Sequence, residues 1–117
     1  MTVNTTIDGK FHILQIQGEV DASNALALDN EIESVLSEGA KNILVDCSEM
    51  TYIASAGLGV FMSKIQDFKK NEIYFSLCSL STNVKNAFDI LGLHEFIKIT
   101  ESLNSAKESI NDEANDC

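Results

Sequence analysis

A serine set among small residues is the feature of the sequence with the clearest chemical potential. Ser55 lies in the run Tyr52-Ile-Ala-Ser-Ala-Gly-Leu-Gly-Val-Phe61, with alanine on both sides of it. A serine at the start of a helix can accept a backbone N–H group and stabilise the helix by about 1 kcal/mol. Gly57 and Gly59 each cost a helix roughly 0.8–1 kcal/mol relative to alanine, which favours a turn kept open for close approach. Helix N-termini also stabilise negative charge, so this turn could hold a phosphate.

The patterns of known catalytic and nucleotide-binding sites are incomplete around this serine. Gly57 and Gly59 are followed by Met62 where a dinucleotide-binding motif has its third glycine, and a P-loop is absent. The sequence also lacks G-x-S-x-G, and we expect His12 in a sheet and His94 in a surface loop, where neither could act as a base. We therefore predict a non-enzymatic protein without catalytic residues, and an enzyme or nucleotide-binding protein is the least favoured alternative.

Charge and cysteine content narrow the range of partners and cofactors. The chain carries 18 Asp and Glu against 8 Lys and Arg, and its net charge is −10. Such a surface repels phosphate backbones and anionic lipids, so we expect neither a nucleic acid nor a membrane partner and favour partners with basic surfaces. Cys47, Cys78 and Cys117 lack metal-ligand spacing and predict no disulfide, no metal and no cofactor. The N-terminus resembles no signal peptide, and no apolar run reaches membrane-spanning length, which indicates a cytoplasmic protein.

The spacing of apolar residues predicts an opening β-hairpin followed by alternating helices and strands. Residues 2–7 and 11–20 form the hairpin, with Asp8-Gly9 as its turn. Asp21 or Ser23 is expected to cap the first helix. That helix ends at Gly39, and a second is expected at 56–71. Ser81 or Thr82 should cap a third helix, with Gly92 just past its end, and Ser102 a last one that includes Ile110. The further strands are expected at 42–46, 72–79 and 96–100.

This order of elements indicates an α/β fold. We expect a sandwich with a mixed, largely parallel sheet of about four or five strands and about four helices. Residues 1–110 should form a single domain, and 111–117 a polar, acidic and frayed tail. Functional loops of parallel sheets gather at the carboxyl ends of the strands. The turns at 18–24, 47–55 and 79–83 should therefore share one edge, with Ser55 at its centre.

Three landmarks in this order resemble the STAS domain of bacterial anti-sigma factor antagonists. The run around Ser55 is preceded by Ile43-Leu-Val-Asp-Cys-Ser48 and, further upstream, by Gly18-Glu-Val-Asp21. Downstream, Val84-Lys-Asn-Ala-Phe88 and Leu91-Gly-Leu93 are similar to the third helix of the family and the turn after it. The resemblance extends from the first strand to the last helix and implies a STAS-type sandwich.

The resemblance also implies a regulator that works by partner switching. Unphosphorylated members of the family bind an anti-sigma factor that is also a serine kinase of the histidine-kinase-like ATPase type, and so release a sigma factor. That kinase phosphorylates the serine matching Ser55, and a PP2C-type phosphatase restores the free form. By this resemblance, the residues that contact the partner are Asp21, Ser23, Asn24, Ala54, Ser55, Ala56, Gly57, Leu58, Gly59 and Met62.

Two positions beside the serine depart from the pattern of the family. Many members have Asp before the serine and Ser or Thr after it, whereas this chain has Ala54 and Ala56, which leaves Ser55 as the single acceptor of the motif. Some STAS domains are constitutive subunits of signalling or transport assemblies, and in that alternative Ser55 is only a helix cap. No long exposed apolar run demands a dimer, so we expect a monomer or a weak dimer.

Overall fold

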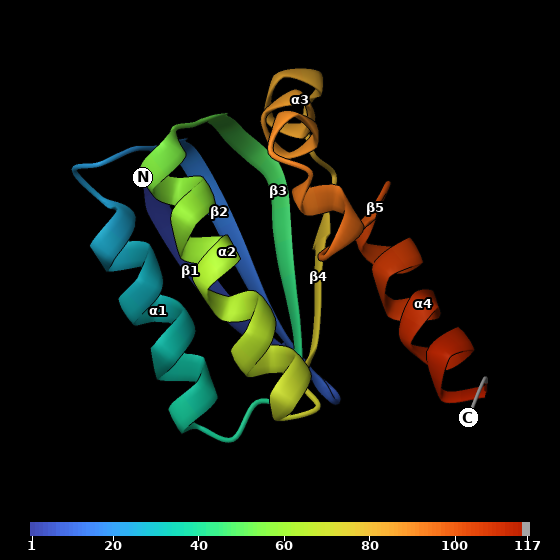
Figure 1. Cartoon of the computed structure of the whole chain (residues 1–117). Helices are drawn as coiled ribbons and strands as arrows, with labels where there is room; N and C mark the ends of the chain where they lie inside the picture. Colours follow the sequence, from blue (N-terminus) through green and yellow to red (C-terminus); the bar gives the residue numbers. More distant parts are fainter. Residues whose placement is uncertain (116–117) are drawn as a thin grey trace.

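Five strands form one mixed sheet in the computed structural model, which describes residues 1–115 (Figure 1). The strands lie in sequence order, with β1 antiparallel to β2 and all later neighbours parallel. Their bounds are β1 Thr2–Asp8, β2 Phe11–Val20, β3 Asn42–Ile53, β4 Tyr74–Cys78 and β5 Lys98–Thr100. The predicted α/β fold with an opening hairpin is confirmed.

Helices cover both faces of this sheet. They are α1 Ala25–Ser37, α2 Ser55–Lys70, α3 Thr82–Ile90, the short 3₁₀ helix η1 Leu93–Glu95, and α4 Leu103–Asn115. Apolar side chains of α1, α2 and α3 pack into one core cluster, and α4 packs into a second cluster with Phe11, Leu44 and Cys78. None of the helices in residues 1–115 is long and apolar enough to cross a membrane.

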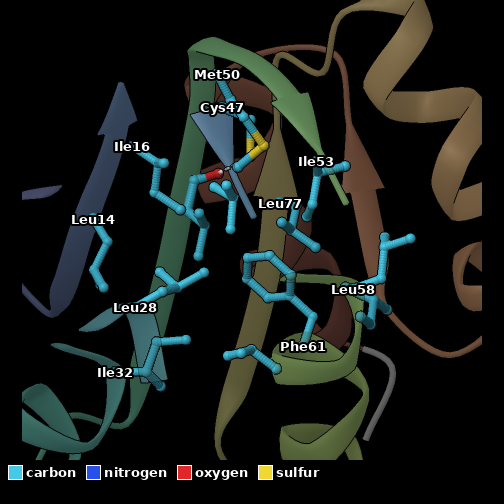
Figure 2. Close-up of a cluster of buried hydrophobic side chains, with 14 of the residues drawn as sticks. Leu14, Ile16, Leu28, Ile32, Cys47, Met50, Ile53, Leu58, Phe61 and Leu77 are labelled. Carbon is cyan, nitrogen blue, oxygen red and sulfur yellow. Dashed lines mark hydrogen bonds between the residues drawn. The ribbon is translucent and has the colours of Figure 1, made fainter. Parts of the chain in front are cut away.

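Alternating side chains of the strands supply the two clusters. In β2, Leu14 and Ile16 point to the larger cluster, whereas Phe11 and Ile13 point to the smaller one. This alternation is the period of two that a strand imposes on its side chains. Figure 2 shows Leu28 of α1 and Phe61 of α2 in this larger cluster, with Phe61 close to Leu77 of β4. The sheet therefore lies between two apolar layers, as in a sandwich.

Several element boundaries differ from the sequence-based expectation. β3 was expected to end at residue 46, with a loop up to the next helix, but it continues to Ile53 and pairs with β2 along most of that length. Its register with β2 shifts twice, so its buried residues do not alternate regularly, and a search for regular alternation fails there. β4 is shorter than expected because Glu72 and Ser79, just outside it, adopt left-handed backbone conformations (φ 56° and 61°).

Helix caps and turns were predicted with mixed success. Ser81 caps α3 by accepting the N–H of Val84, and Ser102 accepts the N–H of Ser105 at the start of α4. The hairpin turn consists of Gly9 and Lys10 rather than Asp8-Gly9, since β1 includes Asp8. α4 continues to Asn115, into the segment expected as a frayed tail, and residues 116–117 lie outside the described residues.

Candidate functional site

Ser55 is the first residue of α2 and is exposed to solvent. The cap position belongs to Ala54, and the helix has no side-chain cap, so the alternative in which Ser55 is a helix cap is not what the structure shows. Among residues 1–115, the hydroxyl of Ser55 has no hydrogen-bond partner. The first hydrogen bond of the helix runs from the N–H of Leu58 to the carbonyl of Ala54 (3.1 Å). The backbone N–H groups before Leu58 have no acceptor within the helix, so the hydroxyl stands at its electropositive end.

The end of β2 fixes the position of this turn. Val20 pairs with Ile53 in the sheet, and the N–H of Ala54 donates to the carbonyl of Val20 (2.8 Å). The chain therefore passes from β3 into α2 with a single residue between them. The loop after β2 must begin directly beside Ser55, because Asp21 follows Val20.

Gly57 and Gly59 serve different purposes. A Cβ atom on Gly57 would lie 2.6 Å from Cγ1 of Val20 and 2.9 Å from Cγ1 of Ile53, so glycine lets α2 approach the sheet here. A Cβ atom on Gly59 would meet nothing within 4 Å, and this residue is exposed. Gly57 and Leu58 are buried, so their first role is packing, whereas Gly59 leaves open space on the surface.

The loop after β2 holds the predicted residues Asp21, Ser23 and Asn24 in a hydrogen-bonded turn. The carboxylate of Asp21 accepts the hydroxyl of Ser23 (2.5 Å) and its N–H (2.9 Å). Asn24 accepts the N–H of Asp21 (2.9 Å) and donates to the carbonyl of Glu19 (3.0 Å). The N-cap of α1 is Asn24 without a side-chain cap bond, so the prediction of Asp21 or Ser23 at that position is wrong: their polar groups bond each other instead.

The charge of Asp21 is favoured by the same contacts. The hydrogen bonds from the hydroxyl and N–H of Ser23 lower the pKa of Asp21 below its ordinary value of 3.8. A lowered pKa keeps this carboxylate ionised in all but strongly acidic solution. The loop therefore presents a fixed negative charge next to the start of α2.

Two of the three expected turns meet at Ser55, and the third lies apart from them. β4 ends at Cys78, which pairs with Asp46, whereas β3 continues to Ile53 before the chain reaches Ser55. The turn at 79–83 is therefore set back along β3. The helix α3 packs beside β3, which extends past the end of β4 (Figure 1).

Exposed apolar side chains surround the two turns that meet. Met62 is 48% exposed and shares one face of α2 with Ser55 and Gly59, because the three follow each other at helical spacing. Leu26 at the start of α1 is 72% exposed, and Tyr52 near the end of β3 is 51% exposed. Sequence reasoning identified Met62 and missed the other two. Leu26 could have been found, since it lies off the buried stripe of α1 formed by Ala25, Leu28 and Ile32.

No group of acidic, histidine or cysteine side chains in residues 1–115 could hold a metal ion. His12 pairs with Ile43 at the start of β3, at the opposite end of β2 from the loop beside Ser55. His94 lies in η1 and is exposed. Neither histidine therefore lies beside Ser55 in the described part of the chain, and its exposed hydroxyl is next to the loop that carries the Asp21 carboxylate.

Comparison with known proteins identifies the family of this chain. The model of the STAS domain family matches residues 2–106. The chain belongs to the STAS domain family. This STAS domain is 24% identical over 101 residues to the anti-sigma-B factor antagonist of Staphylococcus aureus, covering 86% of this chain and 94% of the relative.

Solved structures show the same fold. An anti-sigma factor antagonist from Mycobacterium paratuberculosis has a TM-score of 0.87 at 19% identity, covering 94% of this chain and 93% of the other. The phosphorylated form of the Bacillus cell fate determinant SpoIIAA has a TM-score of 0.71 at 14% identity, covering 93% of this chain and 99% of the other. The STAS domain described here therefore shares its fold with structures of anti-sigma factor antagonists.

Proposed function

We propose that this STAS domain is a cytoplasmic anti-sigma factor antagonist whose binding is switched by phosphorylation of Ser55. In its free form it binds an anti-sigma factor that is also a serine kinase, and a sigma factor is released. The kinase transfers a phosphoryl group to the hydroxyl of Ser55, and a PP2C-type phosphatase removes it. The observation that supports this proposal most directly is the exposed hydroxyl of Ser55 at the open start of α2, which has no hydrogen bond to another of the described residues.

The surroundings of Ser55 explain why a phosphate would break a complex. Phosphorylation adds about −1.5 to −2 charges. The two segments that meet there, 18–24 and 47–55, comprise the ends of β2 and β3 and the residues that follow each strand. They include Glu19, Asp21 and Glu49 but no lysine or arginine. The phosphate is a bulky dianion in place of a small hydroxyl, and no basic side chain of these segments could hold it aside, so it would keep out a partner surface that fits the unmodified turn closely.

The fold itself should tolerate the modification. The hydroxyl is exposed, and the N–H groups at the start of α2 favour a negative charge beside them. The change is therefore expected to remain at the surface, with the backbone of the two turns retained. This behaviour distinguishes a local switch from one that refolds part of the domain.

Binding to a purified kinase-type anti-sigma factor from the organism that encodes this chain would test the proposal. We expect Ser55→Asp to weaken binding by at least about a hundredfold, in line with the loss of a central contact, and Ser55→Ala to bind like the wild type. Ser34→Asp adds the same charge on an exposed position of α1 and should leave binding unchanged. Calorimetry gives the affinities, and circular dichroism verifies the fold of each variant.

Equal binding by Ser55→Asp and the wild type would contradict the switch. It would favour the alternative of a constitutive STAS subunit in a signalling or transport assembly. Peptide mass spectrometry of the protein from its native cells supplies a second test, since a switch requires phosphate on Ser55 whose occupancy changes with growth conditions.

A further inference from the structure

A ridge of exposed apolar side chains lies beside the β5 edge of the sheet. Ile90, Leu91 and Phe96 are 83%, 49% and 67% exposed, and all three belong to residues 90–96, which join α3 to β5. Single exposed apolar residues are ordinary on a protein surface. Three large ones in so short a segment, here called the 90–96 ridge, are more than the scattered single residues that need no explanation, and they mark a candidate binding surface.

Two hollows meet at this ridge, and His94 lines both. The larger has a volume of about 1160 Å³, and its apolar wall includes Ile65, Ile73 and Phe75 beside Phe96. It lies where β5 is too short to cover β4, because β5 pairs with residues 76–78 and leaves Tyr74 and Phe75 beyond its end. An edge strand with uncovered neighbours is a ready surface for association.

We propose that this surface binds a second copy of the chain across a two-fold axis. In a contact of this symmetry the same surface is used by both copies, so it must be complementary to itself. Phe96 lines the apolar hollow and is itself 67% exposed, so each copy can place this ring against the hollow of the other, which meets the requirement. Phe96 and Ile90 are the anchors of this contact.

The distribution of charge favours a second copy as the occupant. Two molecules that each carry a net charge of −10 repel one another, so they can associate only where both signs are present. Both signs occur around the two hollows: the larger is lined by Lys69 with Glu72 and Glu95, and the smaller by Lys85 with Asp89 and Glu101. Acidic groups of one copy can therefore face lysines of the other. The turns at Ser55 contain acidic groups without lysine, and two copies would repel there.

The proposed contact is separate from the surface at Ser55. Figure 1 shows α1 on one flank of the molecule and β5 on the other, with the sheet and α2 between them. A dimer formed through the ridge leaves Ser55 accessible in both copies. The inference therefore does not depend on the phosphorylation switch, and Ser55→Asp should dimerise like the wild type.

Sedimentation equilibrium of the full chain, from micromolar to millimolar concentration, tests the proposal. We expect the wild type to shift reversibly from monomer to dimer. Ile90→Lys and Phe96→Glu should each raise the dissociation constant of the dimer by at least about tenfold, because both remove a central apolar contact. Leu26→Lys is the matched control: it makes the same kind of change at an exposed leucine on the opposite flank and should leave dimerisation unchanged.

Three results would overturn the inference. The first is a wild type that stays monomeric at every concentration, and the second is an equal effect of Ile90→Lys and Leu26→Lys. The third is loss of anti-sigma factor binding in Phe96→Glu without any dimer in the wild type, which would assign the ridge to that partner. Thermal melting of each variant verifies that the monomer is folded, and Ile90 is so exposed that its replacement should not disturb the core.

Discussion

Gly57 and Gly59 look equivalent in the sequence, but their surroundings predict opposite effects of the same substitution. Gly57→Ala would push a Cβ atom against Val20 and Ile53, and we expect it to lower the free energy of unfolding by about 1–3 kcal/mol. Gly59→Ala has open space around its Cβ atom and should raise that free energy by about 0.5–1 kcal/mol, because alanine is the better helix former.

Urea unfolding of the two variants measures this difference directly. Changes of the same sign would show that the start of α2 does not pack against the strand ends as described. The sequence indicated an open turn at both glycines, but only Gly59 is open. Val20 and Ile53, which require glycine at 57, come from the ends of β2 and β3, and periodicity along α2 carries no information about them.

At the scale of elements, one buried lysine joins the first two helices. Lys64 of α2 is only 6% exposed and pairs with Asp29 of α1 (2.9 Å) and with Glu33, one turn further along α1. Lys64→Met should retain the packing of the side chain but leave both carboxylates without their cation. We expect a loss of about 1–3 kcal/mol in the free energy of unfolding, as for other hydrogen bonds to charged groups. Lys70→Met, at an exposed site in the last turn of α2, should cost less than about 1 kcal/mol.

The same ion pairs predict a dependence on pH. Burial disfavours the charged amine, but the hydrogen bonds to Glu33 and Asp29 outweigh this effect and raise the pKa of Lys64 above its ordinary value of 10.5. The stabilisation by Lys64 is therefore complete below pH 10.5 and is lost as the pH rises through the raised pKa. The difference in unfolding free energy between wild type and Lys64→Met should shrink in that alkaline range. A constant difference up to the highest pH at which the protein folds would contradict this account.

The order and type of the elements followed from the sequence, whereas their lengths and caps depended on tertiary contacts. The apolar stripe of α1 and the run Asn42-Ile-Leu-Val-Asp46 have the periods of a helix and a buried strand, and both elements are present. The second half of β3 has no regular period because its ladder with β2 is bulged. At the site, the small residues around Ser55 were enough to predict its importance from the sequence. The exposure of Tyr52 could not be predicted, because it depends on the path of the irregular second half of β3.

At the scale of the whole molecule, charge is distributed unevenly between the two ends of the parallel strands. At the end of the sheet opposite Ser55, the turns contain or adjoin four lysines: Lys10, Lys41, Lys69 and Lys70. The two segments that meet at Ser55 carry Glu19, Asp21 and Glu49 and no lysine or arginine, and the N-terminal amine of Met1, beside Gly18, offsets only part of this negative charge. A negatively charged end of an acidic protein attracts a basic surface over a distance of about one Debye length, which is roughly 10 Å at about 0.1 M salt and longer in more dilute salt.

This asymmetry predicts that the partner at Ser55 is captured by electrostatic steering. The association rate with the anti-sigma factor should fall about tenfold or more between low and physiological salt, with little change in the dissociation rate. A double variant Glu19→Gln/Glu49→Gln should lower the rate at low salt and flatten its salt dependence. Glu31→Gln/Asp67→Asn removes the same charge from exposed sites outside the two turns and should have a smaller effect. Stopped-flow measurements would distinguish the two variants. An equal effect of both would mean that steering depends on net charge alone, and that the lysine-free end at Ser55 does not orient the partner.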